Sequence, residues 1–202
     1  MLKNLFKTIF ILSFILYSGC STNFIAKENK IIIHPRNTWG ANDPKPFKSH
    51  TTVRITIHHE GTYFPQDSLA FRHIKNIQIW GMREKKWADV PYHFFIDGFG
   101  NIIEGRNIFT AGETNTSYNP EGHILISIIG EYHKRQKLNA DQYNSLINLI
   151  THLCKKYQIS PDSIRGHRDY CKPNETDCPG DNIYQFIESR KIIDDVKKKI
   201  KE

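Results

Sequence analysis

The sequence of 202 residues is short of three features that would place it in other classes of protein. No tract has basic residues interleaved with aromatic ones, so we expect no nucleic-acid partner. From His34 onward there is no internal repeat, low-complexity tract or break in composition, and one domain is the simplest account. The apolar run near the N-terminus, TIFILSFILY, has ten residues, whereas a membrane-spanning helix needs about 20.

What is present is the composition of an ordinary globular protein. Hydrophobic residues make up 39% and charged residues 24% of the chain, which is enough for a sizeable core. The formal net charge is +7, and removal of Lys3 and Lys7 with the segment that carries them leaves +5. This excess favours a polyanion or an anionic membrane surface, but it is also common in proteins that bind neither. The charge alone therefore leaves the partner open.

The N-terminal residues, MLKNLFKTIFILSFILYSGC, have the layout of a secretory signal peptide, which we assign to residues 1–19. Cys20 follows Ser-Gly and resembles the lipobox cysteine of bacterial lipoproteins, although Tyr17 departs from the usual aliphatic residue. Residues 20–33 are polar and read as a tether, and residues 34–202 as the domain. We expect lipidation at Cys20 and a lipoprotein in the cell envelope, anchored to the periplasmic face of the outer membrane. The alternative is a soluble secreted or periplasmic protein with an incidental cysteine.

Strand and helix patterns interleave along the domain. Short runs rich in β-branched residues predict buried strands at 53–58 and 123–130, and residues 91–97 and 101–105 predict a hairpin around a Gly-rich turn. Apolar spacing predicts helices at 67–84, from Asn139 and from Asn182 to the end. Asn139 and Gln142 also form a capping-box pattern. The fold class is therefore α/β with a mixed central sheet.

Histidine and cysteine stand where zinc chemistry could use them. A catalytic zinc site has three protein ligands and one open position. His58 or His59 ends a predicted strand, and His167 and Cys178 lie in the loop sequence GHRDYCKPNETDCPG. Imidazole and thiolate suit zinc better than calcium or magnesium. The alternative has His167 as a hydrogen-bonding loop residue and Cys178 in a disulfide, because secreted proteins usually pair their cysteines.

Four blocks carry a resemblance to a known family. IHHEGT, PYHFFIDGFGNIIEGR, ISIIGEY and GHRDY with TDCPG occur in this order. Together they resemble the zinc-dependent N-acetylmuramoyl-L-alanine amidases of type 2, a family that includes the peptidoglycan recognition proteins. The resemblance covers roughly residues 50 to 190. It implies a single domain whose mixed sheet is flanked by helices, and a Zn²⁺ ion held by His58, His167 and Cys178.

The resemblance also implies a reaction. Tyr92 matches the family's catalytic tyrosine, and Thr176 stands where one branch has a catalytic lysine, so both are expected to stabilise the oxyanion. The alternative for Tyr92 is a packed hairpin tyrosine, while His59 and His93 are expected to be structural. Ser127 replaces a glutamate that another branch uses as general base, which leaves the base unassigned.

The predicted function is hydrolysis of the bond between N-acetylmuramic acid and L-alanine in peptidoglycan or muropeptides, by a monomer. The alternatives are a non-catalytic peptidoglycan-binding module of the same fold and a structural lipoprotein. The pattern does not distinguish intact wall from soluble fragments.

Two cysteines remain after these assignments. If Cys20 is acylated and Cys178 binds zinc, Cys154 and Cys171 are left in an oxidising compartment, and we predict that they form a disulfide. The alternative is that Cys154, on the apolar face of its helix, packs as a small hydrophobic residue.

Overall fold

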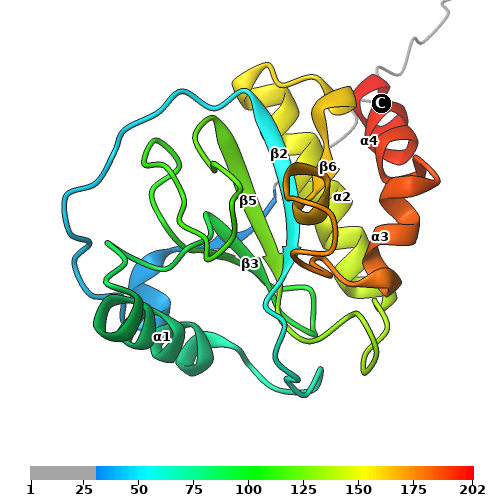
Figure 1. Ribbon diagram of the computed structural model, residues 1–202. Helices are drawn as coiled ribbons and strands as arrows, with labels where there is room; N and C mark the ends of the chain where they lie inside the picture. Colours follow the sequence, from blue (N-terminus) through cyan, green and yellow to red (C-terminus); the bar gives the residue numbers. More distant parts are fainter. Residues whose placement is uncertain (1–30) are drawn as a thin grey trace, which may run out of the picture. The chain divides into compact units, whose positions relative to one another are not determined.

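A computed structural model of the protein describes residues 31–202, and six strands form one mixed sheet in this part of the chain (Figure 1). The strand order is β1-β4-β3-β5-β2-β6, and every neighbouring pair is parallel except β3 and β4. The strands are β1 Ile33–His34, β2 Arg54–His59, β3 Phe94–Ile96, β4 Ile102–Glu104, β5 His123–Ile128 and β6 Arg165–Gly166. The predicted α/β class with a mixed sheet is confirmed.

The strands β2 and β5 are buried on both faces, as the β-branched run of β2 and the continuous apolar run of β5 predict. Ile57 pairs with Ile126 across the two strands, and both side chains are fully buried. The predicted hairpin forms as β3 and β4, which pair antiparallel. Its turn requires glycine, because a Cβ at Gly98 would overlap the backbone of Gln66 and Gly100 has a φ of 78°.

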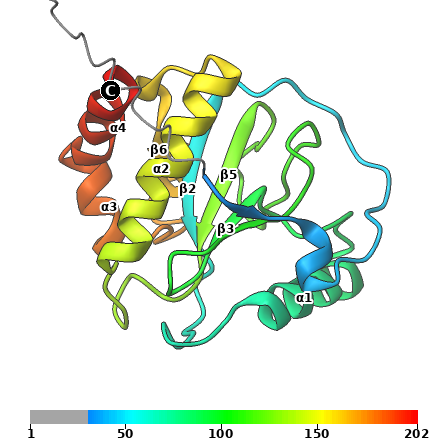
Figure 2. The ribbon, with the colours of Figure 1, turned by 180° about the vertical axis from the view of Figure 1, so that it is seen from behind.

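Helices cover the two faces of the sheet unequally (Figure 2). Three of them, α2 Ala140–Tyr157, α3 Asp181–Glu188 and α4 Lys191–Lys201, pack on the face that carries Ile55 and Ile57. The opposite face carries α1 Phe71–Trp80, and a smaller apolar cluster there includes Phe95 and Ile103. Short helical turns complete the fold: η1 Arg36–Trp39, η2 Gly81–Lys85, η3 Pro161–Ser163 and η4 His167–Tyr170.

The helix predictions are correct in position and wrong in two details. The helix expected at 67–84 begins at Phe71, and its last turn, η2, is a π-helix. The single C-terminal helix expected from Asn182 is two helices, because Arg190 adopts a left-handed conformation with a φ of 62°. This break turns α4 so that Ile192 and Val196 reach the core.

The predicted disulfide between Cys154 and Cys171 is wrong, since both residues are free thiols. Cys154 belongs to the apolar cluster between α2 and the sheet, and burial raises the pKa of its thiol to about 11. Cys171 lies in the loop after η4, where its thiol donates to Thr116 Oγ1 at 3.5 Å. The two cysteines therefore belong to different parts of the packing, and Cys154 is the small hydrophobic residue of the alternative.

The N-terminal predictions fall largely outside the described residues. Signal peptide 1–19, Cys20 and the tether up to Lys30 lie there. Within residues 31–33, Ile31 and Ile33 pack against the core, and β1 begins at Ile33. Across residues 31–202, none of the helices combines the length and the apolar character that crossing a membrane would require.

Replacing the cap of α2 should destabilise the fold. Asn139 Oδ1 accepts from Gln142 N at 2.8 Å, Gln142 Oε1 accepts from Asn139 N, and Asn139 also donates to Gly98 O at 2.8 Å. We expect Asn139→Ala to lower the free energy of unfolding by about 1 kcal/mol. Asn139→Asp, which keeps the acceptor, should lower it less. Urea unfolding measures both, with the exposed Asn148→Ala on α2 as control. Equal stability of Asn139→Ala and wild-type protein would contradict this role.

Candidate metal centre

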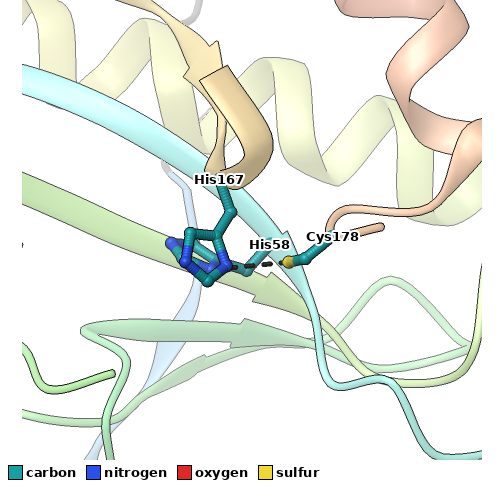
Figure 3. A group of neighbouring side chains, drawn as sticks. All are labelled: His58, His167 and Cys178. Carbon is teal, nitrogen blue, oxygen red and sulfur yellow. Dashed lines mark hydrogen bonds between the residues drawn. The ribbon is translucent and has the colours of Figure 1, made fainter. Parts of the chain in front are cut away.

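Three side chains far apart in the sequence meet at the end of β2 (Figure 3). His58 is on β2, and β6 pairs with β2 through Ile57 and Gly166, so the next residue, His167, comes to lie beside His58. Cys178 lies on the loop before α3, which is tied to η4 because Arg168 N donates to Cys178 O at 2.9 Å. Sheet pairing and this backbone bond together bring the three side chains to one point.

The geometry of the three groups fits a shared ion. One donor atom from each residue can be chosen so that all lie within 4.8 Å of one another, and the residues are buried. His58 Nδ1 is 3.6 Å from Cys178 Sγ. Zinc bond lengths of about 2.3 Å to sulfur and 2.0–2.1 Å to nitrogen place two tetrahedral ligands about 3.6 Å apart. The other ring nitrogen of His58, Nε2, is buried without a hydrogen-bond partner, so the ring is not committed elsewhere.

The electrostatics of the group also suit a divalent cation. Burial, with the nearby His167, lowers the pKa of His58 well below its ordinary value, and burial lowers the pKa of His167 to about 4. Burial raises the pKa of Cys178 to about 12. At neutral pH the group is therefore two neutral imidazoles and a thiol. A divalent cation would bind the imidazoles in this form and favour the thiolate of Cys178. Zinc suits this set of donors.

The neighbouring histidines have other partners. His59 faces the α2 side of the sheet, and its Nδ1 accepts from Tyr132 N at 3.1 Å. His93 Nε2 donates to Thr110 O at 3.0 Å, and its Nδ1 accepts from Leu125 N at 2.8 Å. Both are buried and hydrogen-bonded, which confirms the structural roles expected for them. Because side chains alternate along the strand, only His58 of the two adjacent histidines faces the metal position.

The three proposed ligands lie at a cavity with a volume of about 260 Å³. Tyr92 and Thr176 also line this cavity. The ring of Tyr92 lies 5.1 Å from that of His58, measured between centroids. Burial raises the pKa of Tyr92 far above its ordinary value, so the phenol keeps its proton and can donate a hydrogen bond. Thr176 Oγ1 accepts from Cys178 N at 3.1 Å, which shapes the loop that carries the cysteine and leaves the hydroxyl proton free to be donated.

The cavity also has a wall that the sequence analysis did not identify. Glu113 lines it and accepts from Ala88 N at 2.8 Å, and the same carboxylate pairs with Arg106. Arg106 is buried and also donates to the carbonyls of Val90 and Ala111. These bonds join two chain segments, 88–90 and 111–113, that lie next to lining residues in the sequence or line the cavity themselves. They involve residues up to 25 positions apart with no recognisable local motif, so the sequence carried no signal for them.

Two acidic residues in loops, Glu131 and Glu175, accept hydrogen bonds from backbone amides. Glu175 accepts from Ser117 N at 2.6 Å and from Lys172 N at 3.1 Å. It therefore joins the loop between His167 and Cys178 to the segment before β5. Glu131 accepts from the backbone amides of residues 133–135. Neither residue lines the cavity. Glu60 does line it, and its carboxylate lies 3.4 Å from His73 Nε2.

Buried His93 should make the metal-free protein sensitive to acid. Burial lowers the pKa of His93 to about 3, against an ordinary value of 6.5 in the unfolded chain. Below pH 6.5 the unfolded state binds more protons, so the stabilisation is complete above pH 6.5 and falls as the pH drops toward 3. At pH 5 the loss from this residue should be on the order of 2 kcal/mol. Urea unfolding with chelator at pH 7 and pH 5 should show a smaller loss in His93→Gln than in wild-type protein, and equal losses would refute the assignment.

Comparisons with known proteins identify the family of this chain. A family model described as N-acetylmuramoyl-L-alanine amidase matches residues 48–181. Peptidoglycan-recognition protein SC2 of Drosophila simulans is 30% identical over 161 residues, which cover 78% of this chain and 85% of that protein. N-acetylmuramoyl-L-alanine amidase of Sus scrofa is 28% identical over 166 residues, which cover 77% of this chain and 26% of that protein.

Solved structures show the same fold. Peptidoglycan recognition protein-LE, crystallised in complex with tracheal cytotoxin, a monomeric diaminopimelic acid-type peptidoglycan, is 28% identical with a TM-score of 0.63. The alignment covers 78% of this chain and 92% of that chain. The family match spans more than half of the sequence and includes all four motif blocks. The chain therefore belongs to the family of type 2 N-acetylmuramoyl-L-alanine amidases and peptidoglycan recognition proteins.

Proposed function

We propose that the protein is a zinc-dependent amidase that cleaves the bond between N-acetylmuramic acid and L-alanine in peptidoglycan or muropeptides. The observation that carries this proposal is the meeting of His58, His167 and Cys178 at the cavity that Tyr92 also lines. A relative named for this activity supports the reaction, and the complex of a structural neighbour with a peptidoglycan fragment supports the class of substrate.

The residues of the cavity would have different roles in amide hydrolysis. His58, His167 and Cys178 would hold the zinc ion, which when bound polarises a carbonyl and lowers the pKa of bound water to about 7. Tyr92 would donate its phenol proton in a hydrogen bond to the carbonyl oxygen as that oxygen gains negative charge. Thr176 would contribute a second, uncharged donor from the opposite loop. The three ligands are buried and Tyr92 is partly buried, which keeps the local dielectric low and strengthens each interaction.

A non-catalytic peptidoglycan-binding module is the second candidate, because many relatives carry the name of recognition proteins. The presence of a buried thiol next to His58 favours the enzyme, since a binding module has no need of a metal ligand there. The lipid anchor at Cys20, the envelope location and the monomeric state stay predictions from the sequence.

Loss of the thiol ligand should abolish both zinc binding and hydrolysis. We expect Cys178→Ser to be purified without zinc and to release no L-alanyl peptides from sacculi or muropeptides, because a hydroxyl is a much poorer zinc ligand than a thiolate. Elemental analysis measures the zinc, and mass spectrometry of digests with and without chelator measures the products. Cys154→Ala, in the core, is the matched control and should keep one zinc. Full turnover and a bound zinc in Cys178→Ser would show that the site is misassigned.

Loss of the phenol should affect the chemical step more than binding. We expect Tyr92→Phe to lower kcat by about 10²–10³-fold, the range seen when one oxyanion donor is removed, with zinc content and KM close to those of wild-type protein. Steady-state kinetics on a purified muropeptide gives both constants. Tyr63→Phe, at an exposed tyrosine, serves as control. Unchanged kcat would exclude Tyr92 from the reaction, whereas zinc-loaded wild-type protein that binds muropeptides without cutting them would establish the binding module.

A further inference from the structure

A threonine that the function does not yet use contacts one of the proposed zinc ligands. Thr116 Oγ1 lies 2.8 Å from Nε2 of His167, although the two residues are 51 positions apart. Thr116 lies in the segment before β5 and lines the catalytic cavity together with His167. The contact joins a cavity wall directly to a ligand ring.

This hydrogen bond determines which nitrogen of His167 is available to a metal ion. Nε2 is engaged with Thr116, whereas Nδ1 makes no hydrogen bond within residues 31–202 and is not among the enclosed atoms that lack a partner. Nδ1 is therefore the ring nitrogen that remains free to ligate a metal ion. A ligating imidazole is neutral and carries one N–H, which must lie on the nitrogen that faces away from the metal.

We propose that Thr116 is a positioning residue for His167: its hydroxyl oxygen accepts the Nε2 proton and holds the ring in the tautomer whose Nδ1 lone pair faces the metal position. This inference rests on the zinc site of the proposed function. It concerns an additional residue, Thr116, which would act on the metal through His167.

The surroundings of Thr116 can satisfy its hydroxyl in the orientation that this role requires. Thr116 Oγ1 lies 2.9 Å from Thr114 Oγ1, and Thr114 Oγ1 also accepts from Thr116 N at 3.2 Å. Thr116 Oγ1 accepts a hydrogen bond from the Cys171 thiol at 3.5 Å. A hydroxyl has one proton to donate and accepts two. In that orientation, protons from His167 and Cys171 fill both acceptor positions, and the proton of Thr116 goes to Thr114. Every hydrogen-bonding capacity of the hydroxyl is used.

His167 has particular need of such support. It begins the short turn η4 directly after a two-residue strand, so little regular structure fixes its side chain. Its ring packs against those of Tyr118 and His58, with centroids 5.3 and 4.6 Å away, but these contacts do not distinguish one ring nitrogen from the other. Removal of an outer hydrogen-bond partner of a ligating histidine typically weakens metal binding 10–100-fold.

The test compares zinc affinity in three variants of the full chain. Thr116→Val keeps the shape of the side chain and removes the hydroxyl, and Thr116→Ser restores a hydroxyl. Thr151→Val on α2 is the matched control, because Thr151 Oγ1 is buried without a partner. Competition with a chromogenic chelator should show zinc binding about 10–100-fold weaker in Thr116→Val, and close to wild-type in Thr116→Ser and Thr151→Val. Wild-type affinity in Thr116→Val, or equal weakening in Thr116→Ser, would overturn the proposal.

A second measurement reads the tautomer directly. Long-range ¹⁵N–¹H spectra of the metal-free wild-type protein should show His167 with its proton on Nε2, and Thr116→Val should show a mixture of tautomers. A wild-type proton on Nδ1 would overturn the proposal even if the valine variant failed to fold. Neither measurement depends on turnover. Wild-type protein that binds zinc with the expected tautomer but cuts no muropeptide would refute the proposed function and leave the role of Thr116 intact.

Discussion

The candidate site depends on the pairing of β2 with β6. This pairing is only two residues long, yet it places Gly166 opposite Ile57 and so sets His167 beside His58. Glycine is needed at position 166, because a Cβ there would lie 2.9 Å from Pro179 Cδ and 3.1 Å from the ring of Tyr184. A larger residue would push the loop that carries Cys178 away from the sheet. The close packing of Gly166 against Pro179 and Tyr184 therefore brings His167 and Cys178 to the end of β2.

The same arrangement explains why polar groups are tolerated in a buried position. Two imidazoles and a thiol can all be neutral, and burial shifts each pKa toward the neutral form. The metal-free fold thus avoids buried charge, which would be far more costly than buried neutral groups. A cation would find the sulfur and the imidazole nitrogens already in place, so folding and metal binding would act in the same direction.

The parts of the structure that local patterns encode could be predicted from the sequence. The cap at Asn139 acts within three residues, and the apolar run of β5 is contiguous, so both could be recognised in the sequence. The proximity of His58, His167 and Cys178 was predicted from the order of the family motifs, and the structure brings these residues together. Their role as ligands stays a prediction. Thr116 was missed because its contact with His167 depends on tertiary packing. The Cys154–Cys171 pair was predicted wrongly because counting cysteines gives no distance between them.

Arg106 adds a property that the ligands alone do not provide. Its guanidinium, enclosed by the carbonyls of Val90 and Ala111 and by Glu113, fixes two chain segments whose residues line the cavity. Lysine could not replace it, because an ammonium lacks the planar fork that reaches all of these acceptors. A molecule that binds in this cavity would meet preorganised contact surfaces, so little conformational entropy would be lost on association and more of the interaction free energy would remain for affinity.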